Sequence, residues 1–463
     1  MGLLDNLRNW FISPLMDAMT ADRRGRIDAL ERVREYRKGN QRPQLKAKLG
    51  QYDDNIYLNY TTKIVEQSVS MLFGSSVKFD LPGDQDNNPI QDHIDDTFDA
   101  NHKDILLHAL ATFGAEAGTC YIKMQPDYYD GLCRLIPLDP AFMTIHTDPE
   151  DKDFVTQYVI MFTVQGLNGK TIQRKQEITR EYNLETGDTT HWMVEDYRKD
   201  AWATDWVLID SQRWEYDFPP VHHWQNLPDP ANVYGDPDIT DDIIMLQDKV
   251  NANVSNVNKI IRHHAHPKTV GIGFSREQLG ELGDGPDKFW TVNKEGADIK
   301  NLEMQSELIP AMSHIQMLRQ AMFETTNSVD LASVKDKIGA LTNFGLRILY
   351  SDALNKLNTK RLLYGDALLE IVRRLLVLNG MDDDPGEIVW NDPLPENEGE
   401  HAEALRLDVQ SGFVSVPTAS ERRGYIWETE QERMSQYKNE QEANSDNIGA
   451  ALLRNFVGNR TNQ

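Results

Sequence analysis

Three histidines and an arginine fall together in the stretch KIIRHHAHPK, residues 259–268. His263 and His266 are three positions apart, a spacing that can place two imidazoles on one metal ion. Pro267, however, favours an extended backbone at His266, and neither a nearby cysteine nor an HExxH pattern completes a ligand set. Cations also suit the negative C-terminal end of a helix dipole. The residues therefore favour a helix end over a metal site.

The rest of the sequence offers no catalytic or cofactor-binding motif. It lacks a GxSxG elbow, a Cys–His pair in local context, a carboxylate-rich metal motif and a glycine-rich dinucleotide loop. GLNGKT, residues 166–171, resembles part of a phosphate-binding loop, but Val164 stands where the first glycine is needed and a strand is expected to follow. HAE at 401–403 lacks the PCxxC that completes a zinc deaminase signature. We expect no enzyme activity and no cofactor.

The chain is long and strongly acidic. Its 463 residues can bury the cores of about two to four domains. Its 73 acidic and 48 basic residues give a net charge of -25. Proteins that grip nucleic acid along their surface are normally basic, so tight non-specific DNA binding is not expected. Acidity remains compatible with a role around DNA, because an acidic surface repels phosphate and does not bind it.

The two cysteines and the lack of a long apolar run indicate an intracellular, soluble protein. Cys120 and Cys133 lie in short strand-like runs that flank a turn, so the two thiols could face each other. Two cysteines do not make a disulfide framework, and we expect reduced, intracellular thiols. The first residues are too polar for a secretory signal, and no apolar run reaches membrane-spanning length. We therefore expect a soluble protein with no membrane contact.

Helical spacing and a hairpin are the clearest local signals. The segment 58–74 places apolar residues at helical spacing and stops at Gly74. Residues 155–183 read as two strands around an Asn168–Gly169 turn. A rod follows over 239–265, which Asp238 or Thr240 can cap. Its apolar stripe consists of Ile243, Leu246, Val250, Val254, Val257 and Ile261, and its other faces carry Asn251, Asn253, Asn256 and Asn258. A narrow stripe on a polar rod predicts packing against another helix rather than burial in a globule.

A second rod is expected over 309–327, after a compact mixed segment. The helical spacing of apolar residues is interrupted over 328–343. A very long helix then follows, in which Gly365 favours a bend. A short strand, a turn and charged helices complete the chain. Two rods with a small α/β unit between their ends predict a stalk.

The linear order of these elements resembles the portal proteins of tailed bacteriophages. Four stretches carry the resemblance, and they occur in the family's order: NYTTKIVEQSVSMLFGSSVKF, PPVHHWQNLPDPANVYGDPDITDDIIMLQDKVNANVSN, KIGALTNFGLRILYSDALNKLNTKRLLYGDALLEIV and IVWNDPLPENEGEHAEALRLDVQSGFVSVPTASERRGYI. They resemble, in turn, the family's N-terminal helix and strand, its first stem helix, the helix after its tunnel loop, and its C-terminal strand and helix pair.

The resemblance implies an α+β portal fold with a mixed wing, two stem helices, an α/β clip, a long kinked helix and a helical crown. The implied boundaries are 1–238 for the wing, 239–265 for stem helix 1, 266–308 for the clip, 309–327 for stem helix 2, 328–343 for the tunnel loop, 344–395 for the long helix and return to the wing, and 396–463 for the crown and flexible tail.

The resemblance also implies a function and partners. It implies a ring of about twelve copies at one capsid vertex, through which double-stranded DNA is packaged and ejected. The implied partners are the large terminase subunit, head–tail adaptors, and the major capsid and scaffolding proteins, in a virion assembled in the host cytoplasm. Twelve helices at about 10 Å spacing would leave a bore of about 28 Å, wider than a DNA duplex of about 20 Å. Twelve copies would carry about 300 negative charges, so the walls could repel DNA and lower friction.

Candidate site residues follow from this implied architecture. In the tunnel loop, Lys335 and Lys337 are expected to approach DNA phosphates as a ring of cations; the alternative is pairing with nearby aspartates.

In the clip, Phe289 and Trp290 are candidates for partner docking, although strand packing within the clip is the alternative. At the junction of stem and clip, Arg262, His263 and His264 would form a belt that relieves acidic repulsion without a metal.

Two rival functions remain on the sequence. The first is another ring-forming phage connector or tail component without a packaging role, which binding to the large terminase subunit would discriminate. The second is an acidic enzyme of nucleic-acid processing, which would need a carboxylate metal cluster or ATP hydrolysis. No phosphate loop is present.

Overall fold

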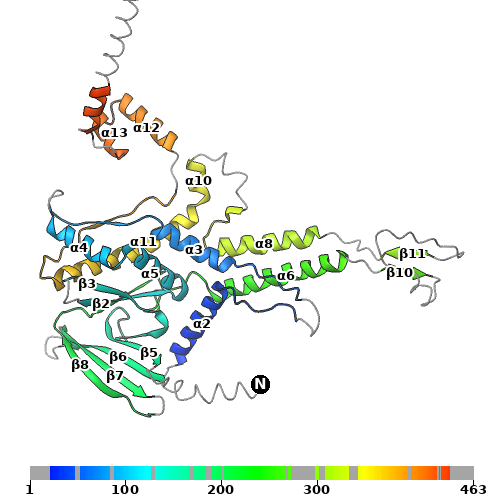
Figure 1. Ribbon diagram of the computed structural model, residues 1–463, viewed down its shortest axis with the longest axis horizontal. Helices are drawn as coiled ribbons and strands as arrows, with labels where there is room; N and C mark the ends of the chain where they lie inside the picture. The colour runs from blue at the N-terminus through cyan, green and yellow to red at the C-terminus, as the bar shows by residue number, and fades with distance from the viewer. Residues whose placement is uncertain are drawn as a thin grey trace, which may run out of the picture. The chain divides into compact units, whose positions relative to one another are not determined.

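Helices and strands mix along the chain in the computed structural model, which confirms the α+β class (Figure 1). The structure describes residues 21–46, 53–83, 88–126, 131–165, 171–182, 189–200, 203–265, 269–272, 298–301, 308–332, 343–394, 398–424, 427 and 429–437. The chain divides into two units, residues 1–393 and 394–463.

The main core of the first unit lies between helices and a three-stranded sheet. The helices are α2 (Ala21–Arg37), α3 (Tyr60–Phe73), α4 (Pro89–Ala100), α5 (Lys103–Ala117) and α11 (Ser351–Leu378), and the antiparallel strands, in the order β3-β2-β9, are Cys133–Pro137, Thr119–Pro126 and Val221–Gln225. The predicted apolar face of α3 is buried in this core, and the helix ends before Gly74 as expected. Gly118 ends α5 at a φ of 81°, which glycine adopts without strain.

A five-stranded antiparallel sheet follows the chain order from β4 to β8. Its strands are β4 (Met143–Thr147), β5 (Val155–Gln165), β6 (Thr171–Tyr182), β7 (Thr189–Asp200) and β8 (Val207–Trp214), and η1 (Pro140–Phe142) precedes them. Trp192, Tyr158 and Ile178 are buried in a second core on this sheet. Gln165 pairs with Thr171, which confirms the predicted hairpin; its turn lies outside the described residues.

Two helices and two ribbons also belong to the first unit. Helix α6 (Asp241–Ala265) and helix α8 (Ile309–Thr325) lie side by side (Figure 1). Between them in sequence, β10 (Thr269–Ile272) pairs antiparallel with β11 (Asp298–Asn301). The second ribbon joins β1 (Lys78–Asp80) to β12 (Glu387–Val389).

The second unit contains α12 (Glu398–Gln410) and α13 (Val416–Arg422), which pack together. Ser415 accepts a hydrogen bond from the backbone N–H of Thr418 and so caps α13. Two helices with one capped end agree with the charged helices expected there.

The expected approach of the two cysteines is wrong. Cys120 and Cys133 do not face each other, because Cys120 pairs with Trp224 of β9 and Cys133 pairs with Pro126 of β2. Both thiols are free and buried.

The long helix is continuous through Gly365, which lies beside the Trp390 ring. The bend expected at this residue stays a prediction. An interruption of the helix falls at Tyr350, after α10 (Asn343–Leu349). Backbone bonds from Tyr350 N to Leu346 O and from Leu354 N to Tyr350 O still cross that junction, at 3.0 and 2.8 Å. Packing of the helix therefore outweighs the conformational cost of its glycine.

Two helical glycines should respond in opposite ways to alanine. At Gly365 an added Cβ would meet only Trp390 atoms at 3.9 Å, so Gly365→Ala should raise the free energy of unfolding by about 0.5–1 kcal/mol. At Gly114 the Cβ would clash with Tyr364 Oη and lie 2.7 Å from Cys120 Sγ, so Gly114→Ala should lower it by about 1–3 kcal/mol. Urea unfolding measures both changes, and equal effects would contradict the packing described.

Candidate functional site: the helix pair and its buried anchor

The pair α6–α8 is buried at one end and exposed at the other. Ile243 and Val250 of α6 join the main core together with Met322 and Phe323 near the end of α8. At the end nearer the β10–β11 segment in sequence, Ile261 and Ile309 are 51% and 65% exposed. The pair is therefore rooted in the core at the start of α6 and the end of α8.

The polar face of α6 holds residues 53–60, a non-helical segment that ends at Tyr60, the first residue of α3; we call it the strap. Three strap amides donate to α6 side chains about one turn apart: Tyr60 N to Gln247 Oε1 at 3.1 Å, Leu58 N to Asn251 Oδ1 at 3.0 Å, and Ile56 N to Ser255 Oγ at 2.9 Å. The three acceptor side chains are fully buried. Four residues of α6 rise about 6 Å, and two extended residues of the strap rise about 6.6 Å. The hydrogen-bonding groups of helix and strap therefore stay in register.

The same face of α6 also binds strap carbonyls. Gln247 Nε2 donates to Leu58 O, and Asn258 Nδ2 donates to Asp54 O at 3.3 Å. Asn251 also donates to Gln41 Oε1. The expectation that α6 avoids burial in a globule is wrong for this face, because the strap covers it. Periodicity detects apolar burial and does not detect polar groups that are buried by hydrogen bonding.

Arg262, a predicted belt residue, lies at the end of this contact. Its Nη2 is 2.6 Å from Oδ2 of the buried Asp54. Arg262 therefore helps to fasten the strap within its own chain. The side chains of His263 and His264 lie outside what the structure describes, so the belt stays a prediction.

A buried ion cluster, which we call the anchor, joins α6, α8 and α11. Asp238, just before α6, has its two oxygens 2.7 Å from Lys360 Nζ and 3.1 Å from Lys356 Nζ. Lys360 also donates to Ser68 Oγ of α3, at 2.8 Å. Lys356 donates to the carbonyl of Thr326 at the end of α8, at 2.9 Å. Asp238 and Thr240 are the two caps that the sequence offers for α6. The carboxylate of Asp238 binds these lysines instead, and Thr240 directly precedes the helix, with its carbonyl accepting from Ile244 N at 3.2 Å.

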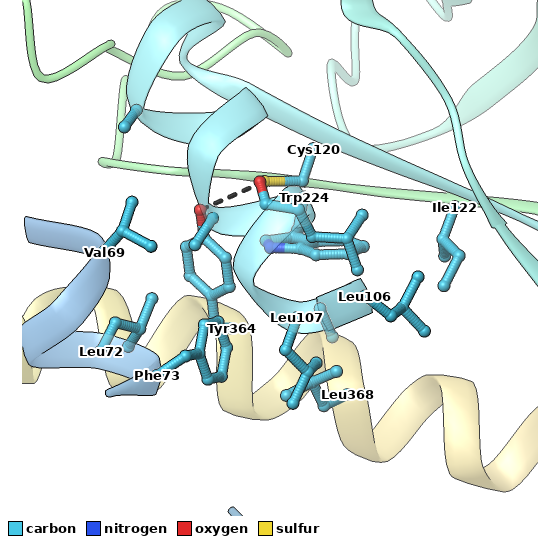
Figure 2. Close-up of a cluster of buried hydrophobic side chains, with 14 of the residues drawn as sticks. Val69, Leu72, Phe73, Leu106, Leu107, Cys120, Ile122, Trp224, Tyr364 and Leu368 are labelled. Atoms are coloured by element: carbon cyan, nitrogen blue, oxygen red, sulfur yellow. Dashed lines mark hydrogen bonds between the residues drawn. The ribbon is translucent and has the colours of Figure 1, made fainter. Parts of the chain in front are cut away.

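Neighbouring polar groups extend the anchor into the core. Tyr364 Oη donates to Asn226 Oδ1 at 3.0 Å, and Asn226 Nδ2 donates to Asp238 Oδ1 at 3.4 Å. Cys120 Sγ lies 3.2 Å from Tyr364 Oη. Figure 2 shows Tyr364, Cys120 and Trp224 among the apolar side chains of the core. Burial raises the pKa of Cys120 to about 12, so its thiol stays protonated and unreactive at neutral pH.

The electrostatics of the anchor favour its charged form. Burial alone raises the pKa of Asp238, but Lys360 and Lys356 outweigh burial and hold that pKa well below its ordinary value. Burial lowers the pKa of Lys360, and the attraction of Asp238 opposes that shift. Because the pKa of Asp238 is lower in the folded state, its stabilising contribution is complete above about pH 4 and is lost as the pH falls further.

An open groove of about 580 Å³ lies beside the anchor. Its lining includes Thr240 before α6, Asn327 after α8, and Asp352 of α11. Within the described residues, no three His, Cys, Asp or Glu side chains gather closely enough to hold a metal ion. The anchor and the strap therefore fasten helices to one another.

The other predicted site residues lie outside the described part of the chain. These are Lys335 and Lys337 of the implied tunnel loop, Phe289 and Trp290 of the implied clip, and His266. Their roles stay predictions. Among the described helices, none is long and apolar enough to span a bilayer.

Breaking the anchor on one side should destabilise the fold. Asp238→Asn leaves Lys360 buried without its counter-charge, so the free energy of unfolding at pH 7 should fall by about 3–5 kcal/mol. The double variant Asp238→Asn/Lys360→Met should recover part of that loss, because Lys360 no longer leaves a buried charge unpaired. Lys356 still lacks its carboxylate and keeps its bond to the Thr326 carbonyl. Urea unfolding of the single and double variants tests the pair; additive losses would show that the two groups do not interact.

Loss of one hydrogen bond between α6 and the strap should loosen the strap. Asn251→Ala removes the acceptor of Leu58 N, so the free energy of unfolding should fall by about 1–3 kcal/mol. Asn253→Ala is the matched control, because among the described residues this side chain bonds only the Lys249 carbonyl of its own helix, and a change within about 0.5 kcal/mol is expected. The hydrogen-exchange rate of the Leu58 amide reports on the strap directly. An unchanged rate in Asn251→Ala would contradict the hydrogen bonds described between the strap and α6.

Comparison with known proteins places this architecture in a family. The family model "Phage portal protein, SPP1 Gp6-like" matches residues 18–447. The chain is also similar to three solved chains of gene transfer agent particles. These come from the virion of the native particle (12% identity, TM-score 0.43, 86% of this chain and 93% of that chain), the neck of the native particle computed with C12 symmetry (13%, 0.42, 79% and 89%) and the neck of the empty particle computed with C6 symmetry (14%, 0.46, 79% and 89%).

No curated protein sequence matches the chain. The family match leaves out only the first 17 and the last 16 residues of the sequence. The chain belongs to the phage portal protein family of the SPP1 Gp6-like type.

Proposed function

We propose that copies of this chain assemble into a ring at one capsid vertex, through which double-stranded DNA enters and leaves the particle. The observation that carries the proposal is the family match over residues 18–447. About twelve copies would form the ring. The chain itself would not hydrolyse ATP, so the large terminase subunit would supply the work of packaging.

The α6–α8 pair is the element best suited to line the channel. Its 25-residue helix α6 is about 38 Å long, and its base is fixed by the anchor. A ring that closes head-to-tail needs two different faces on each copy. With the strap on one face and α8 beside it, α6 keeps an exposed stripe that includes Met245, Lys249, Asn256 and Lys259 for a neighbour or for the channel.

The charge of the pair bears on how DNA would move. Helix α6 contains three acidic and three basic residues, and α8 contains one of each. A channel wall built from these helices would be close to neutral, whereas the net charge of the whole chain suggests an acidic one. A neutral wall binds phosphate weakly, so DNA could pass without being held.

The remaining roles follow the same proposal. Lys335 and Lys337 would contact DNA phosphates, and Phe289 and Trp290 would contribute to docking of terminase or of a head–tail adaptor. Capsid and scaffolding proteins would surround the ring during assembly in the host cytoplasm, and the mature location would be the virion.

Imaging of the purified protein tests the proposal. Negative-stain micrographs should show rings with a central hole, and mass measurement should give about twelve chains. Asp238→Asn is informative here, because a loosened anchor should reduce the fraction of complete rings. Monodisperse wild-type monomers at high concentration would contradict a portal function.

A further inference from the structure

Four residues form one cross-strand row on the β5–β8 sheet, which we call the arginine row. Phe162 stands opposite Arg174, Arg174 opposite Arg198, and Arg198 opposite Val207. Residues directly opposite in antiparallel strands share a face. All four are exposed, Val207 to 63%. Two arginines are therefore direct cross-strand neighbours on the surface, between two apolar residues.

The row carries positive charge that the chain does not fully balance. Like charges directly opposite each other destabilise a sheet. Arg198 has Asp200 of its own strand at 2.9 Å, but both side chains are largely exposed, and such pairs contribute little. Within the described residues, Arg174 has no ion pair or side-chain hydrogen bond. An acidic partner would relieve this repulsion.

The surroundings of the row have the composition of an interface. From Phe162 to its end, β5 is no longer buried, and the Phe142 ring lies 6.2 Å from the Phe162 ring. Aromatic residues and arginine are enriched where proteins contact each other. Strands β6, β7 and β8 contain three, two and one basic residues against two, three and one acidic residues, and β5 has no charge. This sheet is neutral in a chain of net charge -25.

The opposite charge lies elsewhere on the same chain. The turn MDDDPG, Met381–Gly386, connects α11 to β12, and Asp382, Asp383 and Asp384 are all exposed. Three adjacent aspartates repel one another, as the two arginines do. Acidic copies repel in general, so they approach best where a local basic group meets a local acidic one.

We propose that the arginine row of one copy receives the acidic turn of the next copy. The inference rests on the proposed ring, because head-to-tail closure joins two different surfaces of identical chains. The arginines would bind the aspartates, and Phe162 and Val207 would shield these pairs from water, which strengthens them.

Charge exchange tests the contact. Arg174→Glu/Arg198→Glu should raise the protein concentration needed for half-assembly by on the order of tenfold, and Asp382→Lys/Asp383→Lys should do the same. Combining the four changes should restore assembly, since the charges are then exchanged. Lys199→Glu is the matched control: it lies on the opposite face of β7 and should leave assembly unchanged. Mass photometry across a dilution series gives the ring fraction, and thermal unfolding confirms that each variant is folded.

Cross-linking distinguishes a head-to-tail contact from a symmetric contact between two copies. Cysteines placed at Val207 and Asp382 of one chain should link into a ladder of multimers, because each copy offers one of each. The native cysteines are buried and should not compete. Linkage of Val207 to Val207 would give pairs only and would overturn the proposal.

Assembly of Arg174→Glu/Arg198→Glu at the wild-type concentration would also overturn the proposal, as would failure of the aspartate changes to rescue that variant. An absence of rings in the wild type would refute the proposed function, and this inference with it.

Discussion

A carboxylate buried away from water needs a counter-charge, and in this chain that requirement joins three helices. Asp238 precedes α6, its two lysines belong to α11, and Lys356 also holds the carbonyl that ends α8. An apolar contact tolerates small sliding and repacking, whereas a buried charge that loses its partner is costly. The base of the α6–α8 pair is thus fixed by electrostatics, and the rest of the pair extends from a fixed point.

The strap supplies a second constraint of the same kind along α6. The apolar stripe of α6 could meet a neighbour in more than one register, because one turn of the helix resembles the next. Hydrogen bonds at Gln247, Asn251 and Ser255 permit only one register, since a shift leaves buried polar groups unpaired. Polar groups therefore specify the position of a helix whose apolar residues provide most of its burial energy.

Local physics explains what could be predicted from the sequence. The α3 stripe, the β5–β6 hairpin and the two rods depend on periodicity and turn residues within short windows. The anchor could not be predicted in this way, because Lys360 lies 122 residues from Asp238, and a local rule made that aspartate a cap. Asn251 was misjudged for the same reason: its strap partner, Leu58, is 193 residues away.

The distribution of charge connects these local constraints to assembly. The α6–α8 pair and the β5–β8 sheet are each neutral, so the excess of 25 negative charges belongs to the remaining surfaces. Repulsion between those surfaces acts over about a Debye length, near 8 Å at physiological salt, and added salt weakens it. A direct arginine–aspartate contact is weakened by salt as well, but its shielded core is weakened less. In the proposed ring, attraction would be confined to matched local contacts, and the acidic general surface would keep copies from aggregating and would repel DNA.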